Sequence, residues 1–122
     1  MMLVVGVAFA GAIGAPARFL LDGFVQRRTS STFPFGTFVV NLLGAFTLGT
    51  LTGLALHHGL GKAPKVLLGA GFCGAFTTFS TFSYETMALA EDGAWRNAGL
   101  NVALSLAVGL AAAAAGLALA VL

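Results

Sequence analysis

The chain consists of long apolar runs separated by three short polar breaks. The apolar runs are residues 2–26, 33–56, 65–90 and 97–122. The breaks are residues 27–32, 57–64 and 91–96. Each run is long enough to cross a bilayer as a helix, which takes about 20 residues. The pattern predicts an all-α membrane protein, in which residues 1–122 form a single domain with four transmembrane helices per chain.

Composition supports lipid as the solvent for most of the surface. Only 8% of the 122 residues are charged, 58% are hydrophobic, and the mean hydropathy is +0.97. Soluble domains carry about 25% charged residues, so this chain could not cover a water-facing surface. The net charge of +2 without a basic cluster argues against nucleic acid as a partner. Cys73 is the one cysteine and offers no disulfide framework.

The positive charges do not choose an orientation. Lys62 and Lys65 lie in or beside the second break, whereas Arg27, Arg28 and Arg96 lie in the first and third breaks on the opposite side. Because positive charge in short loops sets topology, two against three is nearly balanced. The chain could insert both ways and form an antiparallel dimer, or another signal could impose one orientation.

Small residues predict a tight bundle. Gly6, Ala10 and Gly14 recur every four residues in the first helix, and Gly49 and Gly53 do the same in the second. Such stripes let helix backbones approach closely in lipid. Pro16 lacks a backbone donor, which predicts a kink or the end of a turn in the first helix. Four helices enclose a hydrated pathway poorly, so the small size favours dimerisation.

Polar groups concentrate in the third helix. Five hydroxyl residues fall within seven positions, namely Thr77, Thr78, Ser80, Thr81 and Ser83. Gly69, Gly71 and Gly74 precede them and weaken the helix. We expect a break near residues 74–78 at mid-membrane, tolerated where protein or a cavity satisfies the backbone. Its freed carbonyl oxygens would suit an alkali cation, especially if a symmetric dimer doubled their number.

Three further groups could serve an anion or only helix packing. Phe79 and Phe82 lie on one helix face, and the positive edge of a benzene ring attracts small anions. Phenylalanines in membrane helices are usually lipid or packing contacts. Asn41, at mid-depth of the second helix, could offer an amide N–H to an anion, but an interhelical hydrogen bond is the ordinary role. Asn101 and Ser105 share a stripe in the fourth helix, with Ser105 deeper.

No arrangement of residues indicates an enzyme. The chain contains no Ser-His-Asp arrangement, no HExxH motif, no phosphate-binding Gly-Lys loop and no paired carboxylates at membrane depth. His57 and His58 lie in the second break without further metal ligands.

Three segments carry a family resemblance over nearly the whole chain. They are GAIGAPARF at residues 11–19, PFGTFVVNLLG at 34–44 and GAFTTFSTFS at 74–83, the last followed by Glu85. The third is the most specific of the three. With these motifs the chain resembles the Fluc/CrcB fluoride ion channel family.

The resemblance implies a passive, fluoride-selective channel that exports fluoride from the cytoplasm and lowers its toxicity. It implies an antiparallel, dual-topology homodimer in the cell inner (plasma) membrane, with two pores lined by Phe79 and Phe82 and with Asn41 as polar partner. It implies a structural sodium ion at the dimer interface, held by the backbone carbonyls of Gly74 and Thr77. The expected hydroxyl track is Thr78, Ser80, Thr81 and Ser105, and Arg18 would serve the vestibule.

Two positions depart from the family pattern, and two other functions stay open. Pro16 sits inside the first-helix motif, and Asn101 stands where some members have a tyrosine. A small multidrug-type, proton-coupled cation transporter is the alternative, but its membrane-depth carboxylate in helix one is missing, since Asp22 lies near the end of that helix. A structural helper subunit is the third hypothesis, in which the polar run serves helix contacts alone.

Overall fold

A computed structural model describes residues 1–29 and 32–122, and these residues form helices and connecting turns without a strand. The elements are α1 (Met2–Thr29), α2 (Phe35–His57), α3 (Lys62–Val66), η1 (Leu67–Cys73), α4 (Gly74–Phe76), α5 (Phe79–Glu91) and α6 (Trp95–Val121). Four stretches are long and apolar enough to cross a membrane, with α3 to α5 forming the third. The predicted all-α, four-span architecture is therefore confirmed.

The helices extend further into the polar breaks than the sequence predicted. Arg27 and Arg28 belong to the last turn of α1, where positive side chains face the negative end of the helix dipole. At the other breaks, Lys62 begins α3, Trp95 begins α6, and Glu91 ends α5. The predicted breaks were too wide because charged residues in terminal turns resemble loop residues in sequence. Ser30 and Ser31, which belong to the first predicted break, lie outside the described residues.

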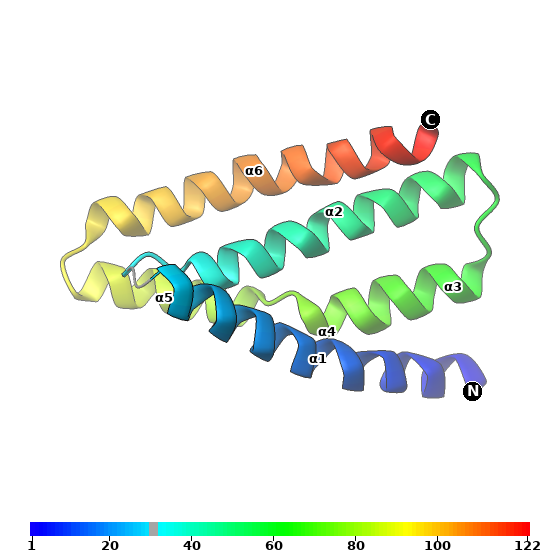
Figure 1. Ribbon diagram of the computed structural model, residues 1–122, viewed down its shortest axis with the longest axis horizontal. Coiled ribbons are helices and arrows are strands. Elements are labelled where there is room, and N and C mark those ends of the chain that lie inside the picture. The colour runs from blue at the N-terminus through cyan, green and yellow to red at the C-terminus, as the bar shows by residue number, and fades with distance from the viewer. Residues whose placement is uncertain (30–31) are drawn as a thin grey trace.

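The spans lie roughly side by side in the order α6, α2, third span and α1 (Figure 1). α2 packs mainly on α6, α1 packs on η1 and α4, and α5 returns to contact α6. Both termini lie at the same end as the connection between α2 and α3, as an even number of spans requires (Figure 1). The interruption between α4 and α5 lies about midway along the bundle (Figure 1).

Small residues bring the helix backbones together, as their spacing predicted. A Cβ atom added to Gly49 would strike the backbone carbonyl of Ala113 on α6, and one added to Gly116 would strike the carbonyl of Phe46 on α2. Gly14 of α1 meets the carbonyl of Phe72 in the same way. The α2–α6 and α1–η1 seams therefore depend on the absence of side chains at these points.

Pro16 does not end a turn of α1, which is helical from Met2 to Thr29. The expectation of an ending there is wrong because a proline removes only one backbone hydrogen bond, while the packing of Gly14 against η1 holds the helix on both sides.

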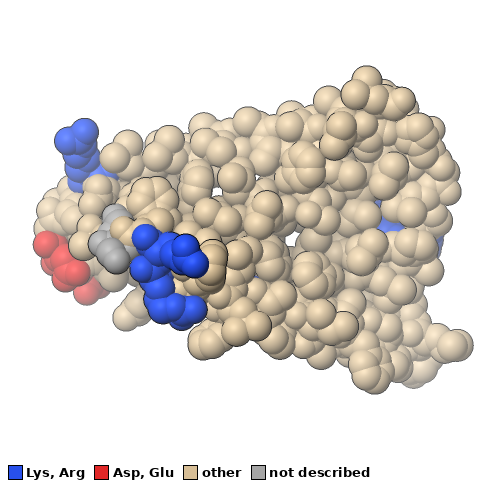
Figure 2. Space-filling model, viewed as in Figure 1, with Lys and Arg blue, Asp and Glu red and all other residues tan. Residues whose placement is uncertain are grey.

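The charged side chains gather at the ends of the bundle, and the middle of the visible face carries none (Figure 2). Only 6% of the most apolar window of α1, and likewise of α6, is buried within the chain. Most of the surface of these two helices therefore faces lipid or another protein.

Candidate functional site

The third span changes character twice before it breaks. It begins as α3, continues as the π-helix η1, and ends its first half in the three residues of α4. Thr77 and Thr78 then adopt extended backbone, with φ/ψ of −81°/160° and −149°/120°, before α5 begins at Phe79. The break predicted near residues 74–78 is confirmed. π-helical turns are rare and frequently accompany functional sites.

The side-chain amide of Asn41 holds the break open from α2. Thr78 N donates to Asn41 Oδ1 at 2.8 Å, and Asn41 Nδ2 donates to Thr78 O at 3.0 Å. Asn41 thus satisfies both backbone polar groups of one residue, as a neighbouring β-strand would. The interhelical hydrogen bond expected as the ordinary role is present. An amide NH2 group has two donors, and the bond to Thr78 O uses one of them.

Two carbonyls of the break lose the donors that a continuous helix would give them. The helical partner of the Gly74 carbonyl would be Thr78 N, which donates to Asn41 instead. The helical partner of the Thr77 carbonyl would be Thr81 N, which donates to Thr78 Oγ1 at 3.1 Å as an N-cap. These are the two oxygens that the family resemblance assigned to a cation.

The surroundings of these carbonyls fit a hard cation. The Thr77 hydroxyl is directed backwards, donating to the Cys73 carbonyl at 2.9 Å, so it does not cover the break. A Cβ atom added to Gly74 would meet nothing closer than an oxygen at 3.8 Å, so this side of α4 is open. Backbone carbonyls are among the oxygen ligands that hard cations accept.

The two phenylalanine rings begin the second half of the span. The rings of Phe79 and Phe82 lie 6.0 Å apart between centroids and are tilted by 39°. Phe79 is 79% exposed although it lies at mid-span, whereas Phe82 is half-buried. Beside Phe79 an open cavity of about 260 Å³ is lined by Asn41, Ala45, Leu48, Thr77 and Thr78. Within one chain, the ring of Phe79 and the cavity beside it are therefore open to the outside of the bundle.

The predicted hydroxyl track is gathered only in part. Thr78 Oγ1 accepts from Thr81 N and lies 3.4 Å from Ser80 Oγ. Ser105 lies on the other side of Asn41, where both residues line a small cavity of about 30 Å³ with Phe38, Leu42 and Gly109. Ser80 is exposed and Thr81 half-buried in the first turn of α5. Arg18 is half-buried on α1 and does not line the described cavities.

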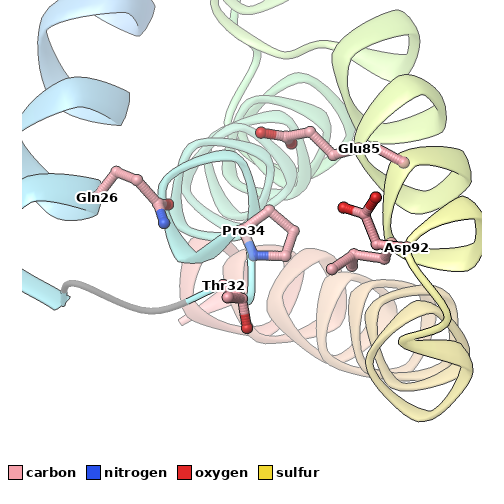
Figure 3. A pocket seen from close by; sticks show the side chains of 7 residues that line it. Gln26, Thr32, Pro34, Glu85 and Asp92 are labelled. Carbon is pink, nitrogen blue, oxygen red and sulfur yellow. The ribbon is translucent and has the colours of Figure 1, made fainter.

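Glu85 lines two cavities at the end of the bundle, of about 330 and 300 Å³. Figure 3 shows Glu85 and Asp92 on one side of the first cavity and Gln26 on the other. Gln26 joins the ends of two spans, since it accepts from Gly36 N at 3.1 Å and donates to Phe33 O at 3.3 Å. Through Glu85 this polar region includes α5, the helix that also carries Phe79 and Phe82.

Thr37 and Thr86 are polar residues that sequence reasoning did not place in the site. Thr37 is 3% exposed and lies beside Glu85. Within the described residues, Thr37 Oγ1 and Glu85 Oε1 make no hydrogen bond of ordinary geometry, although the two side chains are close enough to interact. Thr86 Oγ1 donates to Phe82 O at 2.8 Å. The spacing of Thr37 one turn before Asn41 was the available signal for Thr37. No sequence signal indicated Thr86, because its partner on α6, Asn101, lies 15 residues away in the chain.

Comparison with known proteins decides the family. Residues 5–117 match the family model of the CrcB-like proteins, described as Camphor Resistance (CrcB). The chain belongs to the CrcB family. Among curated CrcB relatives, "Fluoride-specific ion channel FluC 1" of Streptomyces avermitilis is 49% identical over 111 residues, covering 90% of each chain.

Two further CrcB relatives are similarly close. "Fluoride-specific ion channel FluC 1" of Leifsonia xyli subsp. xyli is 45% identical, over 95% of this chain and 85% of that protein. "Fluoride-specific ion channel FluC 2" of Mycobacterium tuberculosis is 48% identical, over 92% and 86%. The resemblance inferred from the three motifs is thereby confirmed, and the multidrug-type alternative is not favoured.

Proposed function

We propose that this CrcB protein is a fluoride-selective passive channel that exports fluoride from the cytoplasm and so lowers its toxicity. The names of the relatives support the ion. The observation that carries the proposal is the open cavity beside the break, where an amide, a hydroxyl and an exposed aromatic ring meet at mid-span. None of these groups carries a charge, so a small anion would be held loosely enough to pass on.

Each hydrogen-bond donor around the cavity would contact the ion at a different part of the path. The second N–H of Asn41 is the one left for an anion once Thr78 O has taken the first. The Thr78 hydroxyl oxygen accepts from Thr81 N. The hydroxyl proton of Thr78 therefore points away from Thr81 N, toward Ser80 or the cavity. The positive edges of Phe79 and Phe82 would continue the path along α5, with Ser80 and Thr81 beside them. Ser105 would add a donor from α6, and Arg18 would raise the anion concentration in the vestibule.

The path would be completed by a second copy in inverted orientation. Phe79 is too exposed for a ring that lines a pore within one chain, which supports a partner surface facing it. The nearly balanced charges, Lys62 and Lys65 against Arg27, Arg28 and Arg96, support insertion in both orientations. A two-fold axis in the membrane plane would then give an antiparallel homodimer with two pores. A multi-pass chain of this kind belongs in a membrane, here the cell's plasma membrane.

The same axis would bring two copies of the break together. The carbonyls of Gly74 and Thr77 from both chains would hold a structural sodium ion there. These carbonyls, contributed by both chains, would find in the cation the partner that the interrupted helix denies them, and so would hold the two chains together. The open side of Gly74 and the diverted helix donors support this assignment.

Efflux from liposomes tests the function. We expect the reconstituted protein to release fluoride quickly and chloride slowly. Replacing Phe79 or Phe82 by isoleucine should lower the fluoride rate about tenfold, since it removes a polarised ring edge. Phe9→Ile is the matched control, because Phe9 is also an exposed ring, on α1 and away from the cavity. Well-folded wild-type protein without fluoride flux would refute the channel, and proton-driven export of an aromatic cation would revive the multidrug-type alternative.

A further inference from the structure

The most completely buried side-chain amide among the described residues lies on α6, outside the cavity beside Phe79. Asn101 is 1% exposed. Its Nδ2 donates to Thr86 Oγ1 on α5 at 2.8 Å, and Thr86 Oγ1 donates to the carbonyl of Phe82 at 2.8 Å. Ser105 Oγ donates to Asn101 Oδ1 at 3.4 Å. A chain of hydrogen bonds thus runs from Ser105 through Asn101 and Thr86 to the backbone of Phe82.

The chemistry of Thr86 fixes the direction of this chain. A threonine hydroxyl has one proton, and that of Thr86 goes to the Phe82 carbonyl. Thr86 Oγ1 must therefore accept from α6, so the NH2 group of Asn101 faces it. The oxygen of Asn101 then faces Ser105. A leucine or alanine at position 101 could not impose this order, and an aspartate would place an acceptor against an acceptor.

The bond at the Ser105 end is loose. Hydroxyl donors commonly lie about 2.7–2.8 Å from their acceptors, so 3.4 Å is long. Ser105 also lines the cavity of about 30 Å³ beside Asn41. A cavity of this size has room for about one water or small ion. The Ser105 proton can therefore turn from Asn101 Oδ1 toward an occupant of that cavity without leaving a strong bond.

We propose that Asn101 is a positioning residue of the ion path, which holds the turn carrying Phe82 through Thr86 and keeps the Ser105 hydroxyl ready for an anion beside Asn41. The role rests on the proposed function, because it presumes that Phe82 and Ser105 line the path. A bond that merely tied α5 to α6 would need only the first link. The ordered donors and the loose terminal bond connect the two sides of the path instead.

Fluoride efflux and ¹⁹F NMR together test this role. The variants are Thr86→Val, which keeps the shape and loses the hydroxyl, Thr86→Ser, which keeps the hydroxyl, Asn101→Ala, and the double variant. Thr47→Val is the matched control, since Thr47 Oγ1 donates to the carbonyl four residues earlier at 2.8 Å, as Thr86 does, and has no second side-chain partner among the described residues. The NMR probe is 4-fluorophenylalanine at position 82 in the full-length protein.

We expect Thr86→Val and Asn101→Ala each to slow efflux about tenfold, and the double variant to slow it no more than either alone, because both break one chain. Thr86→Ser and Thr47→Val should match the wild type. The ¹⁹F signal should be single in wild type and Thr86→Ser, and broadened or doubled in Thr86→Val and Asn101→Ala.

An unchanged ¹⁹F signal in Thr86→Val would overturn the role, as would additive losses in the double variant. If Asn101→Ala fails to fold, the isosteric Thr86→Val decides alone. A wild-type protein that conducts no fluoride would refute the proposed function, and the ¹⁹F comparison would still decide whether Asn101 positions Phe82.

Discussion

The pairing of Asn41 with Thr78 makes a strong prediction about stability, because one side chain satisfies both polar groups of a backbone unit at membrane depth. Asn41→Ala leaves the N–H and the carbonyl of Thr78 without partners. A buried polar group left unpaired costs about 1–3 kcal/mol, so the two together should cost about 2–6 kcal/mol of unfolding free energy. Asn41→Asp still accepts from Thr78 N but cannot donate, so it should lose the second bond and also bury a charge.

A rearrangement of the backbone would recover part of this free energy. With Asn41 gone, Thr78 N can return to the carbonyl of Gly74 and close the helix across the break. The cost would then fall to that of one unpaired group, about 1–3 kcal/mol, since the other group regains a partner. The Gly74 carbonyl would be covered, and the protein should lose any dependence of its stability on sodium.

Denaturant titration in detergent micelles, followed by circular dichroism with and without sodium, measures both effects. Asn97→Ala is the control, because Asn97 is a half-buried asparagine in the first turn of α6 that makes no side-chain hydrogen bond to the described residues. It should stay within about 0.5 kcal/mol of wild type. The reasoning fails if Asn41→Ala unfolds at the same denaturant concentration as Asn97→Ala and keeps its sodium dependence.

Three further predictions follow from other parts of the structure. Gly49→Ala should destabilise the bundle by about 1–3 kcal/mol, because the added Cβ would strike the backbone of Ala113 on α6. Gly99→Ala is the control, since Gly99 has open space around it, and it should be neutral or stabilise by up to about 1 kcal/mol. The same denaturant titration measures both variants. Replacing sodium by N-methylglucamine should lower the stability of the dimer by about 2.7 kcal/mol if sodium stood at about 100 times its dissociation constant, and equal melting in both salts would count against the cation site. In the His58→Cys variant, an impermeant maleimide added outside cells should label about half of the chains if the balanced charges let the chain insert in both orientations. Cys73 is 1% exposed and does not compete for the label. Labelling near zero or near completion would indicate one orientation.

The sequence was sufficient for the elements whose signals are local. Four apolar runs gave four spans, and Gly69, Gly71 and Gly74 before paired threonines placed the break correctly. The π-helical form of residues 67–73 was not predicted, because a glycine-rich apolar stretch carries no periodicity that separates it from an α-helix. The positive side chains at the end of α1 were assigned to a loop because their favourable interaction with the helix dipole cannot be read from hydropathy.

The partners of buried polar groups could not be predicted, because they join positions far apart in the chain. Asn41 and Thr78 are 37 residues apart, and Asn101 and Thr86 are 15 apart on different helices. Helical periodicity says which residues share a face, but not at what depth two faces meet or how the intervening backbone is offset. The exposure of Phe79 was also not predicted, because helical periodicity does not say which residues of a span the rest of the chain leaves uncovered.

The glycine-lined seam between α2 and α6 also has a mechanical consequence. Where the two helix backbones pack directly on each other, no flexible side chains lie between them, so α2 and α6 should move as one rigid unit. α5 is hydrogen-bonded to this unit at two places. Thr78, at the start of α5, bonds to Asn41 on α2, and Thr86, within α5, bonds to Asn101 on α6. Because Gly14 packs α1 on η1 in the same way, we expect thermal motion to take the form of the α1–η1 pair shifting against the unit of α2, α6 and α5, rather than of single helices moving separately.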